Sequence, residues 1–115
     1  MKFLHKPFQA KPKDKIEVTF DKPTKVIFLE RREFERYKKG ITYRYHGGFP
    51  EESPVTFEVP YKGIWHAVIE KGTFKNPLDV SGNATLIPHK YDTLNGAEQM
   101  ETRKREAQEY DDTLD

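Results

Sequence analysis

Two alternating apolar runs joined by a Pro/Gly turn constrain the fold of this chain more than any other feature. Val55–Val59 alternates apolar and polar residues, Pro60–Gly63 provides the turn, and Ile64–Glu70 follows as a second β-rich run. Alternation with a period of two is typical of strands, and such a connection between two runs is typical of a hairpin. We therefore predict a β-hairpin over Val55–Glu70, with Val55, Phe57 and Val59 pointing into a core.

The second run presents different side chains to its two faces. Because successive residues of a strand point to opposite faces, Trp65 is expected on one face together with Ala67 and Ile69. His66 is then expected on the other face, between Ile64 and Val68. This places His66 among apolar neighbours.

Further strands are predicted on both sides of this hairpin. Ile16–Phe20 and Ile41–His46 alternate apolar and polar residues, and Gly47 and Gly48 are expected to end the second of them. Val26–Leu29 is an unbroken apolar run, which is typical of a central strand covered on both faces. Leu78–Leu86 is expected to be a late strand with a bulge at Gly82.

A short helix is predicted over Glu30–Lys39. Phe34 and Tyr37 fall on one helical face, and Glu35 and Lys39 are spaced to form an i,i+4 ion pair. Gly40 follows as a residue suited to the left-handed helix end.

These elements predict an all-β fold, a small antiparallel sandwich or barrel with one short helix. We place the β-rich domain at residues 1–88 and a charged tail at residues 89–115. The stretch Ala97–Tyr110 has good helix propensity but almost no apolar stripe, so we expect a helical or disordered tail. Strand order and oligomeric state do not follow from the pattern.

Charge and composition narrow the function classes. The 115-residue chain has net charge +1, although residues 1–89 hold sixteen basic and eleven acidic side chains and residues 90–115 hold four and eight. A net charge near zero gives no general attraction to nucleic acid or to an anionic membrane. Cysteine is absent, and the N-terminus lacks the apolar stretch of a signal peptide, so we expect a cytoplasmic protein.

Several short motifs resemble a known bacterial family. They occur in a consistent order as Met1–His5, Tyr37–Gly40, Tyr45–Gly48, Ser53–Val55 and Val59–Ile69. Together they resemble the family catalogued as domain of unknown function 1883, over about residues 1–88. The resemblance implies a β module that occurs alone or beside Toll/interleukin-receptor-like domains, and it implies no catalytic residue.

Aromatic residues near cations form the most interesting candidate site. Such rings stack on a sugar, a base or a peptide, while neighbouring cations bind its polar groups. We expect Tyr43 and Trp65 to be core residues and Tyr61, in the Pro/Gly connection, to be exposed. The candidate ligand-binding residues are Tyr61, Arg44, Tyr45, His46, Lys62 and His66.

His66 also carries an alternative hypothesis. A histidine in an apolar setting can have a shifted pKa and transfer protons, with Glu58 or Asp79 brought near by folding. The alternative is a structural, hydrogen-bonded histidine, which we favour because the sequence places no nucleophile or carboxylate beside it. The four histidines show no spacing typical of a metal site, so neither a metal nor a cofactor is expected.

The sequence therefore favours a non-catalytic binding or protein-interaction module whose ligand is not identified. We favour a protein that is not an enzyme, with a small hydrolase or lyase using His66 as the alternative. The expected partner is a protein or a small polar ligand. Nucleic-acid binding by the basic N-terminal quarter is a weaker third hypothesis, and no membrane partner is expected. The tail is either solubilising or ordered by a partner.

Overall fold

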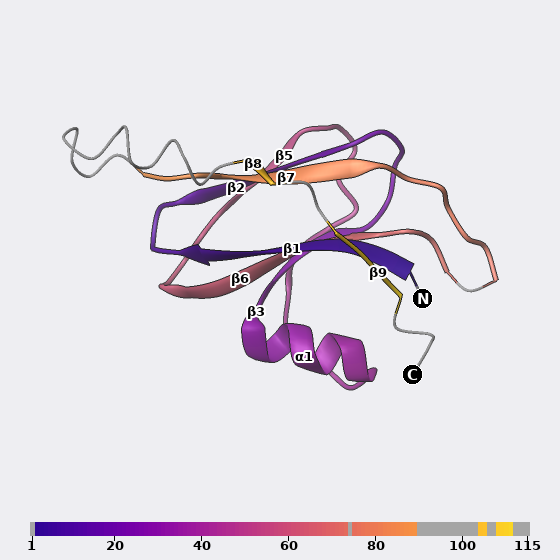
Figure 1. The fold of residues 1–115 in the computed structure, drawn as a ribbon, viewed down its shortest axis with the longest axis horizontal. Helices are drawn as coiled ribbons and strands as arrows, with labels where there is room; N and C mark the ends of the chain where they lie inside the picture. Colours follow the sequence, from indigo (N-terminus) through magenta and orange to yellow (C-terminus); the bar gives the residue numbers. More distant parts are fainter. Residues whose placement is uncertain (1, 74, 90–103, 106–107, 112–115) are drawn as a thin grey trace.

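The chain folds into two stacked antiparallel sheets with a helix on the outer face of one of them (Figure 1). The computed structural model describes residues 2–73, 75–89, 104–105 and 108–111. The first sheet has the order β4 (His46–Gly48), β3 (Val26–Glu30), β6 (Gly63–Glu70), β1 (Lys2–Ala10) and β9 (Gln108–Asp111). The second has the order β5 (Val55–Glu58), β2 (Lys15–Phe20), β7 (Gly82–Ile87) and β8 (Lys104–Arg105). The expected small all-β sandwich with one short helix is confirmed.

The main core fills the space between the two sheets. Trp65, Ala67 and Ile69 of β6 all point into it, as the alternation predicts. From the second sheet, Ile16 and Val18 of β2 reach the same core. Removing these apolar side chains from water is the main favourable contribution to the stability of such a sandwich.

A second apolar layer lies between the first sheet and α1 (Arg31–Lys39). Phe34 and Tyr37 of the helix are buried against Phe3, Ile27, Leu29 and Val68. The first four residues of β3 are all buried because the strand faces the sandwich core on one side and the helix on the other. The predicted central strand and the helical face are both confirmed.

Both ends of α1 are fixed by local chemistry. Glu30 precedes the helix, and its side chain accepts a hydrogen bond from the Arg32 main-chain N–H at 3.2 Å. Gly40 ends the helix with a left-handed φ of 73°, and its N–H bonds back to the last helical turn. Glycine adopts this conformation without the cost that a Cβ would add.

The predicted hairpin over Val55–Glu70 is wrong. Both runs form strands, but β5 pairs with β2 in the second sheet, and β6 pairs with β1 and β3 in the first. At Val59 the chain hydrogen-bonds to Lys13 and Asp14 and then crosses between the layers. The alternation correctly predicts which face of each strand packs on the core. It does not show that the two strands belong to different sheets, which pack on that core from opposite sides.

The strand predicted at Ile41–His46 is also wrong, because only His46 of that range lies in a strand. Main-chain groups before it bond elsewhere: the Arg44 N–H donates to the Glu33 side chain at 2.8 Å. Gly47 belongs to β4 instead of ending a strand, with φ of 105°. A Cβ there would lie 2.4 Å from the Val26 carbonyl oxygen, so only glycine lets β4 approach β3 so closely.

Two further differences concern β7 (Gly82–Ile87) and β1 (Lys2–Ala10). The late strand begins at Gly82, so Leu78–Ser81 lies outside it, and the predicted bulge at Gly82 is wrong because β7 pairs with β2 in an unbroken register from Gly82 onward. β1 was not predicted, because Lys6 breaks its apolar alternation at an inward position. Lys6 is buried, and its ammonium donates to the Ala84 carbonyl oxygen of the other sheet at 2.8 Å. A charged donor that reaches a main-chain acceptor in this way is not visible in an apolar pattern.

The predicted tail helix falls partly outside the described residues, since residues 97–103 and 106–107 are not described. Where the backbone is described it is extended instead of helical: β8 pairs with β7, and β9 pairs with β1. The domain boundary at residue 88 stays a prediction. No helix among the described residues has the length and hydropathy to cross a bilayer.

Candidate binding pocket

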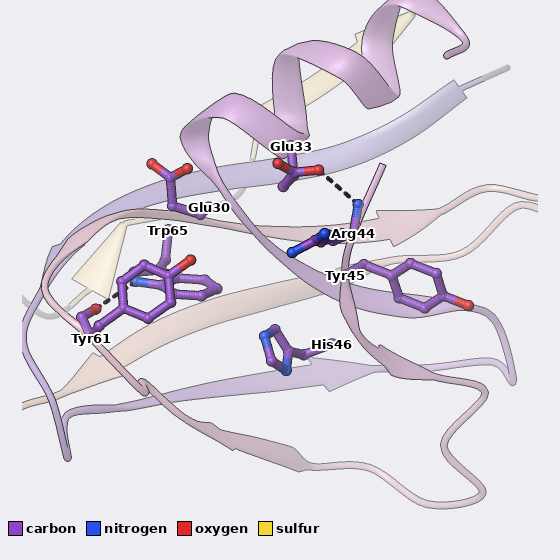
Figure 2. A pocket seen from close by; sticks show the side chains of 7 residues that line it. All are labelled: Glu30, Glu33, Arg44, Tyr45, His46, Tyr61 and Trp65. Atoms are coloured by element: carbon purple, nitrogen blue, oxygen red, sulfur yellow. Dashed lines mark hydrogen bonds between the residues drawn. The ribbon is translucent and has the colours of Figure 1, made fainter. Parts of the chain in front are cut away.

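A pocket of about 450 Å³ opens where the start of α1, the chain before β4 and the start of β6 meet (Figure 2). Residues from three separate parts of the chain line it. They are Glu30, Glu33, Arg44, Tyr45, His46, Tyr61 and Trp65.

The acidic residues come from the start of the helix. Glu30 is the last residue of β3 and caps α1, while Glu33 lies in the first helical turn. Glu33 accepts the hydrogen bond from the Arg44 N–H, which ties the chain before β4 to the helix (Figure 2). This contact places the Arg44 side chain at the pocket.

The Arg44 guanidinium is available to a ligand. Its side chain extends into the group of pocket residues in Figure 2. Within the part of the chain that the structure describes, no carboxylate lies within 4.0 Å of it. An arginine in this setting can donate several hydrogen bonds in a fixed planar geometry.

His46 is held at the pocket by β4. Its ring lies 5.1 Å from that of Phe57 and 5.7 Å from that of Trp65, measured between centroids. Gly47, which allows β4 to approach β3, therefore also determines where His46 lies. The imidazole offers a polar edge beside aromatic surface.

Tyr61 and Trp65 form the aromatic side of the pocket. The Trp65 indole N–H donates to the Tyr61 carbonyl oxygen at 3.0 Å, and the two rings lie 5.0 Å apart at 62°. Trp65 is 1% exposed, whereas Tyr61 is 51% exposed, as the sequence predicts for both. The buried indole thus supports a tyrosine ring that a ligand can contact.

Tyr45 lies on the other side of the group in Figure 2. It is 45% exposed, its ring lies 5.5 Å from that of Tyr43, and the Lys25 ammonium lies 4.9 Å from its centroid. Tyr43 was expected to be a core residue; it is half-buried and packs against the apolar layer beneath α1. Tyr45 therefore lines the edge of the pocket, with its ring pointing away from the other residues drawn in Figure 2.

Four of the six predicted ligand-binding residues therefore meet in one pocket, namely Arg44, Tyr45, His46 and Tyr61. Lys62 is exposed beside Tyr61 but does not line the pocket, and His66 lies on the opposite face of β6. The prediction omitted Glu30 and Glu33. In the sequence, acidic residues at this position indicate the start of a helix and not a binding site. They lie beside the aromatic residues only in the folded protein.

His66 is packed beneath α1 against aromatic rings. It is 8% exposed, and its ring stacks on Phe34 at 4.0 Å and lies 5.8 Å from that of His5. Its buried Nδ1 has no hydrogen-bond partner among the described residues. The expected hydrogen bond of a structural histidine is thus missing at Nδ1, and packing holds the ring.

Burial lowers the pKa of His66 to about 4, and the nearby His5, Lys38 and Arg31 act in the same direction while Glu35 opposes them. The pKa of His5 is lowered too, first by burial and then by Lys38.

The carboxylates considered as partners of His66 lie elsewhere. Glu58 is an exposed residue of β5 in the other sheet, and Asp79 is an exposed residue between β6 and β7. Among the described residues, no carboxylate lies within 4.0 Å of the His66 ring. In the described parts of the chain, no three His, Asp or Glu side chains are placed so that they could hold a metal ion.

The comparisons with known proteins agree with the sequence resemblance. The family model described as a domain of unknown function (DUF1883) matches residues 1–85. No curated protein and no solved structure matches the sequence. The match covers β1 to most of β7, and therefore all seven residues that line the pocket.

Proposed function

Because this chain belongs to the DUF1883 family of domains of unknown function, we propose its function from the pocket: it is a non-catalytic binding module. Arg44, Tyr45, His46 and Tyr61 are its ligand-binding residues, with Glu30, Glu33 and Trp65 added by the geometry. The ligand is a small polar molecule or a polar segment of a protein. We further propose that the protein is bacterial, as the family resemblance implies, and cytoplasmic, because a cysteine-free sequence fits a reducing compartment.

One observation carries this proposal: exposed aromatic surface, a guanidinium and two carboxylates from three chain segments meet in one pocket. Ligand sites are typically concave, with aromatic lining and a few polar groups that orient the ligand. The residues lie at the ends of strands and a helix, where a packed scaffold holds connecting segments in place. These features support binding.

The alternative of a hydrolase or lyase using His66 has less support. His66 does not line the pocket, and its ring packs against Phe34 of α1, on the face of β6 opposite Trp65. Its lowered pKa has an ordinary cause in burial beneath α1. We therefore do not propose catalysis.

A ligand screen with matched variants tests the proposal. The protein is exposed to a mixed library of sugars, amino acids, short peptides and nucleotides, and binding is detected by ligand-observed NMR. We expect Tyr61→Ala and Arg44→Ala to weaken each genuine ligand about tenfold or more. Phe49→Ala is the matched control, because Phe49 is a 77% exposed aromatic residue outside the pocket. If every ligand binds the three variants and the wild type equally, the pocket is not the binding site.

A further inference from the structure

We propose that the ligand of this pocket is a neutral sugar, with one ring of the sugar stacked on Tyr61. This inference rests on the proposed binding function and adds the chemical class of the ligand. It is drawn from the charges of the pocket, the hydrogen-bonding capacity of its polar groups and the exposure of its aromatic rings.

The charges of the pocket argue against a ligand with one dominant charge. Glu30 and Glu33 contribute two carboxylates, and Arg44 contributes a guanidinium, all lining the same space of about 450 Å³. A ligand with one dominant charge, of either sign, would be attracted by one part of this lining and repelled by another. A neutral ligand avoids this repulsion and can still accept hydrogen bonds from the charged groups and donate them.

The polar groups call for a ligand with many donors and acceptors. Each carboxylate uses one oxygen to accept a main-chain N–H, from Arg32 or Arg44, and keeps further lone pairs. Carboxylates only accept hydrogen bonds, and the Arg44 guanidinium only donates them. A hydroxyl group does both, so a ring carrying several hydroxyls can satisfy both kinds of group at once.

The aromatic side selects a ligand with an apolar face. Tyr61 is about half exposed, and its ring is supported by Trp65 at 5.0 Å. The C–H face of a sugar ring can lie against this tyrosine while the hydroxyls around its edge bond to polar side chains that line the same pocket, Arg44 among them. A flat aromatic base would use the ring but has fewer hydroxyl groups for the charged edge.

The indole N–H of Trp65 provides a direct readout. Trp65 is the only tryptophan in the chain, so its indole gives a single, assigned signal in a ¹H–¹⁵N NMR spectrum. The N–H donates to the Tyr61 carbonyl oxygen, and a ligand stacked on Tyr61 will therefore shift this signal. The probes are glucose, galactose, mannose, N-acetylglucosamine and their disaccharides, with arginine amide as a cation and citrate as an anion.

We expect at least one neutral sugar to shift the Trp65 signal in a saturable way, with an affinity that changes little between about 50 mM and about 500 mM salt. Tyr61→Ala should weaken this sugar about tenfold, and the Phe49→Ala control should leave its affinity unchanged. If no sugar of the panel shifts the signal, the inference is overturned.

Two charge-neutralising variants separate this inference from the proposed function. Glu30→Gln keeps a side-chain oxygen that can accept the Arg32 N–H, so the helix cap is retained. For a neutral sugar, the weakening caused by Glu30→Gln or by Arg44→Gln should be the same at about 50 mM and at about 500 mM salt, because no charge on the ligand is involved. If arginine amide shifts the signal and loses more than about tenfold in Glu30→Gln, or citrate does so in Arg44→Gln, the ligand is charged. The sugar inference then fails while the pocket remains a binding site; if no probe and no library compound binds, both proposals fail.

Discussion

Acidification should destabilise this protein through the histidines beneath α1. When the pH falls from 7 to 4, His66 is protonated in the unfolded state at a higher pH than in the folded state. His66 has a pKa of about 4 in the folded protein, against an ordinary value of 6.5. Between these two values the unfolded state binds a proton that the folded state does not, so stability falls as the pH falls. Well above pH 6.5 this histidine is neutral in both states and contributes no pH dependence.

The size of the effect follows from the difference between the two pKa values. A difference of about 2.5 units corresponds to about 3 kcal/mol lost by pH 4, a large fraction of the 5–15 kcal/mol typical of a small domain. The lowered pKa of His5 adds to the loss in the same direction. The groups that face His66 are His5 from β1 and Arg31, Glu35 and Lys38 from α1. Only Glu35 favours the protonated form.

Urea unfolding followed by Trp65 fluorescence measures this effect at several pH values. Because carboxylates also titrate near pH 4, the comparison is with His66→Phe, which keeps a ring against Phe34 but does not titrate. We expect the variant to lose about 3 kcal/mol less than the wild type between pH 7 and pH 4. Equal losses in the wild type and His66→Phe would refute the reasoning.

Three further predictions concern the scaffold. Gly47→Ala should lower the free energy of unfolding in urea by about 1–3 kcal/mol, because the φ of Gly47 is 105° and a Cβ would lie 2.4 Å from a main-chain oxygen of β3. Gly63→Ala is the control: a Cβ there has contacts no closer than 3.8 Å, so the loss should be less than about 1 kcal/mol. Lys6→Ala should lower the free energy of unfolding in urea by about 2–3 kcal/mol, because the Ala84 carbonyl oxygen loses this donor between the sheets. An unchanged urea midpoint would exclude a stabilising role for the buried ammonium. A chain ending at Pro88 should still unfold cooperatively by circular dichroism, since both described apolar clusters lie within residues 1–88; loss of folding would place the tail inside the domain.

The faces of the strands were predictable, and their partners were not. Alternation placed Trp65 and His66 on opposite sides of β6, because side-chain direction is a local property of a strand. The partner of a strand depends on where the chain crosses between layers. At Val59, main-chain hydrogen bonds to Lys13 and Asp14 direct that crossing, and no local pattern shows bonds between residues so far apart.

The same division applies to the pocket. The exposure of Tyr61 followed from its Pro/Gly connection, and the polar aromatic stretch from Arg44 to His46 was visible as a local cluster. Glu30 and Glu33 were missed because their contribution depends on the start of α1 lying against the chain before β4. Binding residues supplied by a distant element become visible only when the fold brings the elements together.

The affinity of one identified ligand for three proteins tests the central claim most directly. Isothermal titration gives the Kd of the strongest ligand from the screen for the wild type, Tyr61→Ala and Phe49→Ala. The account predicts a Kd about tenfold higher for Tyr61→Ala and an unchanged Kd for Phe49→Ala. The same Kd for all three proteins would contradict the assignment of this pocket as the binding site.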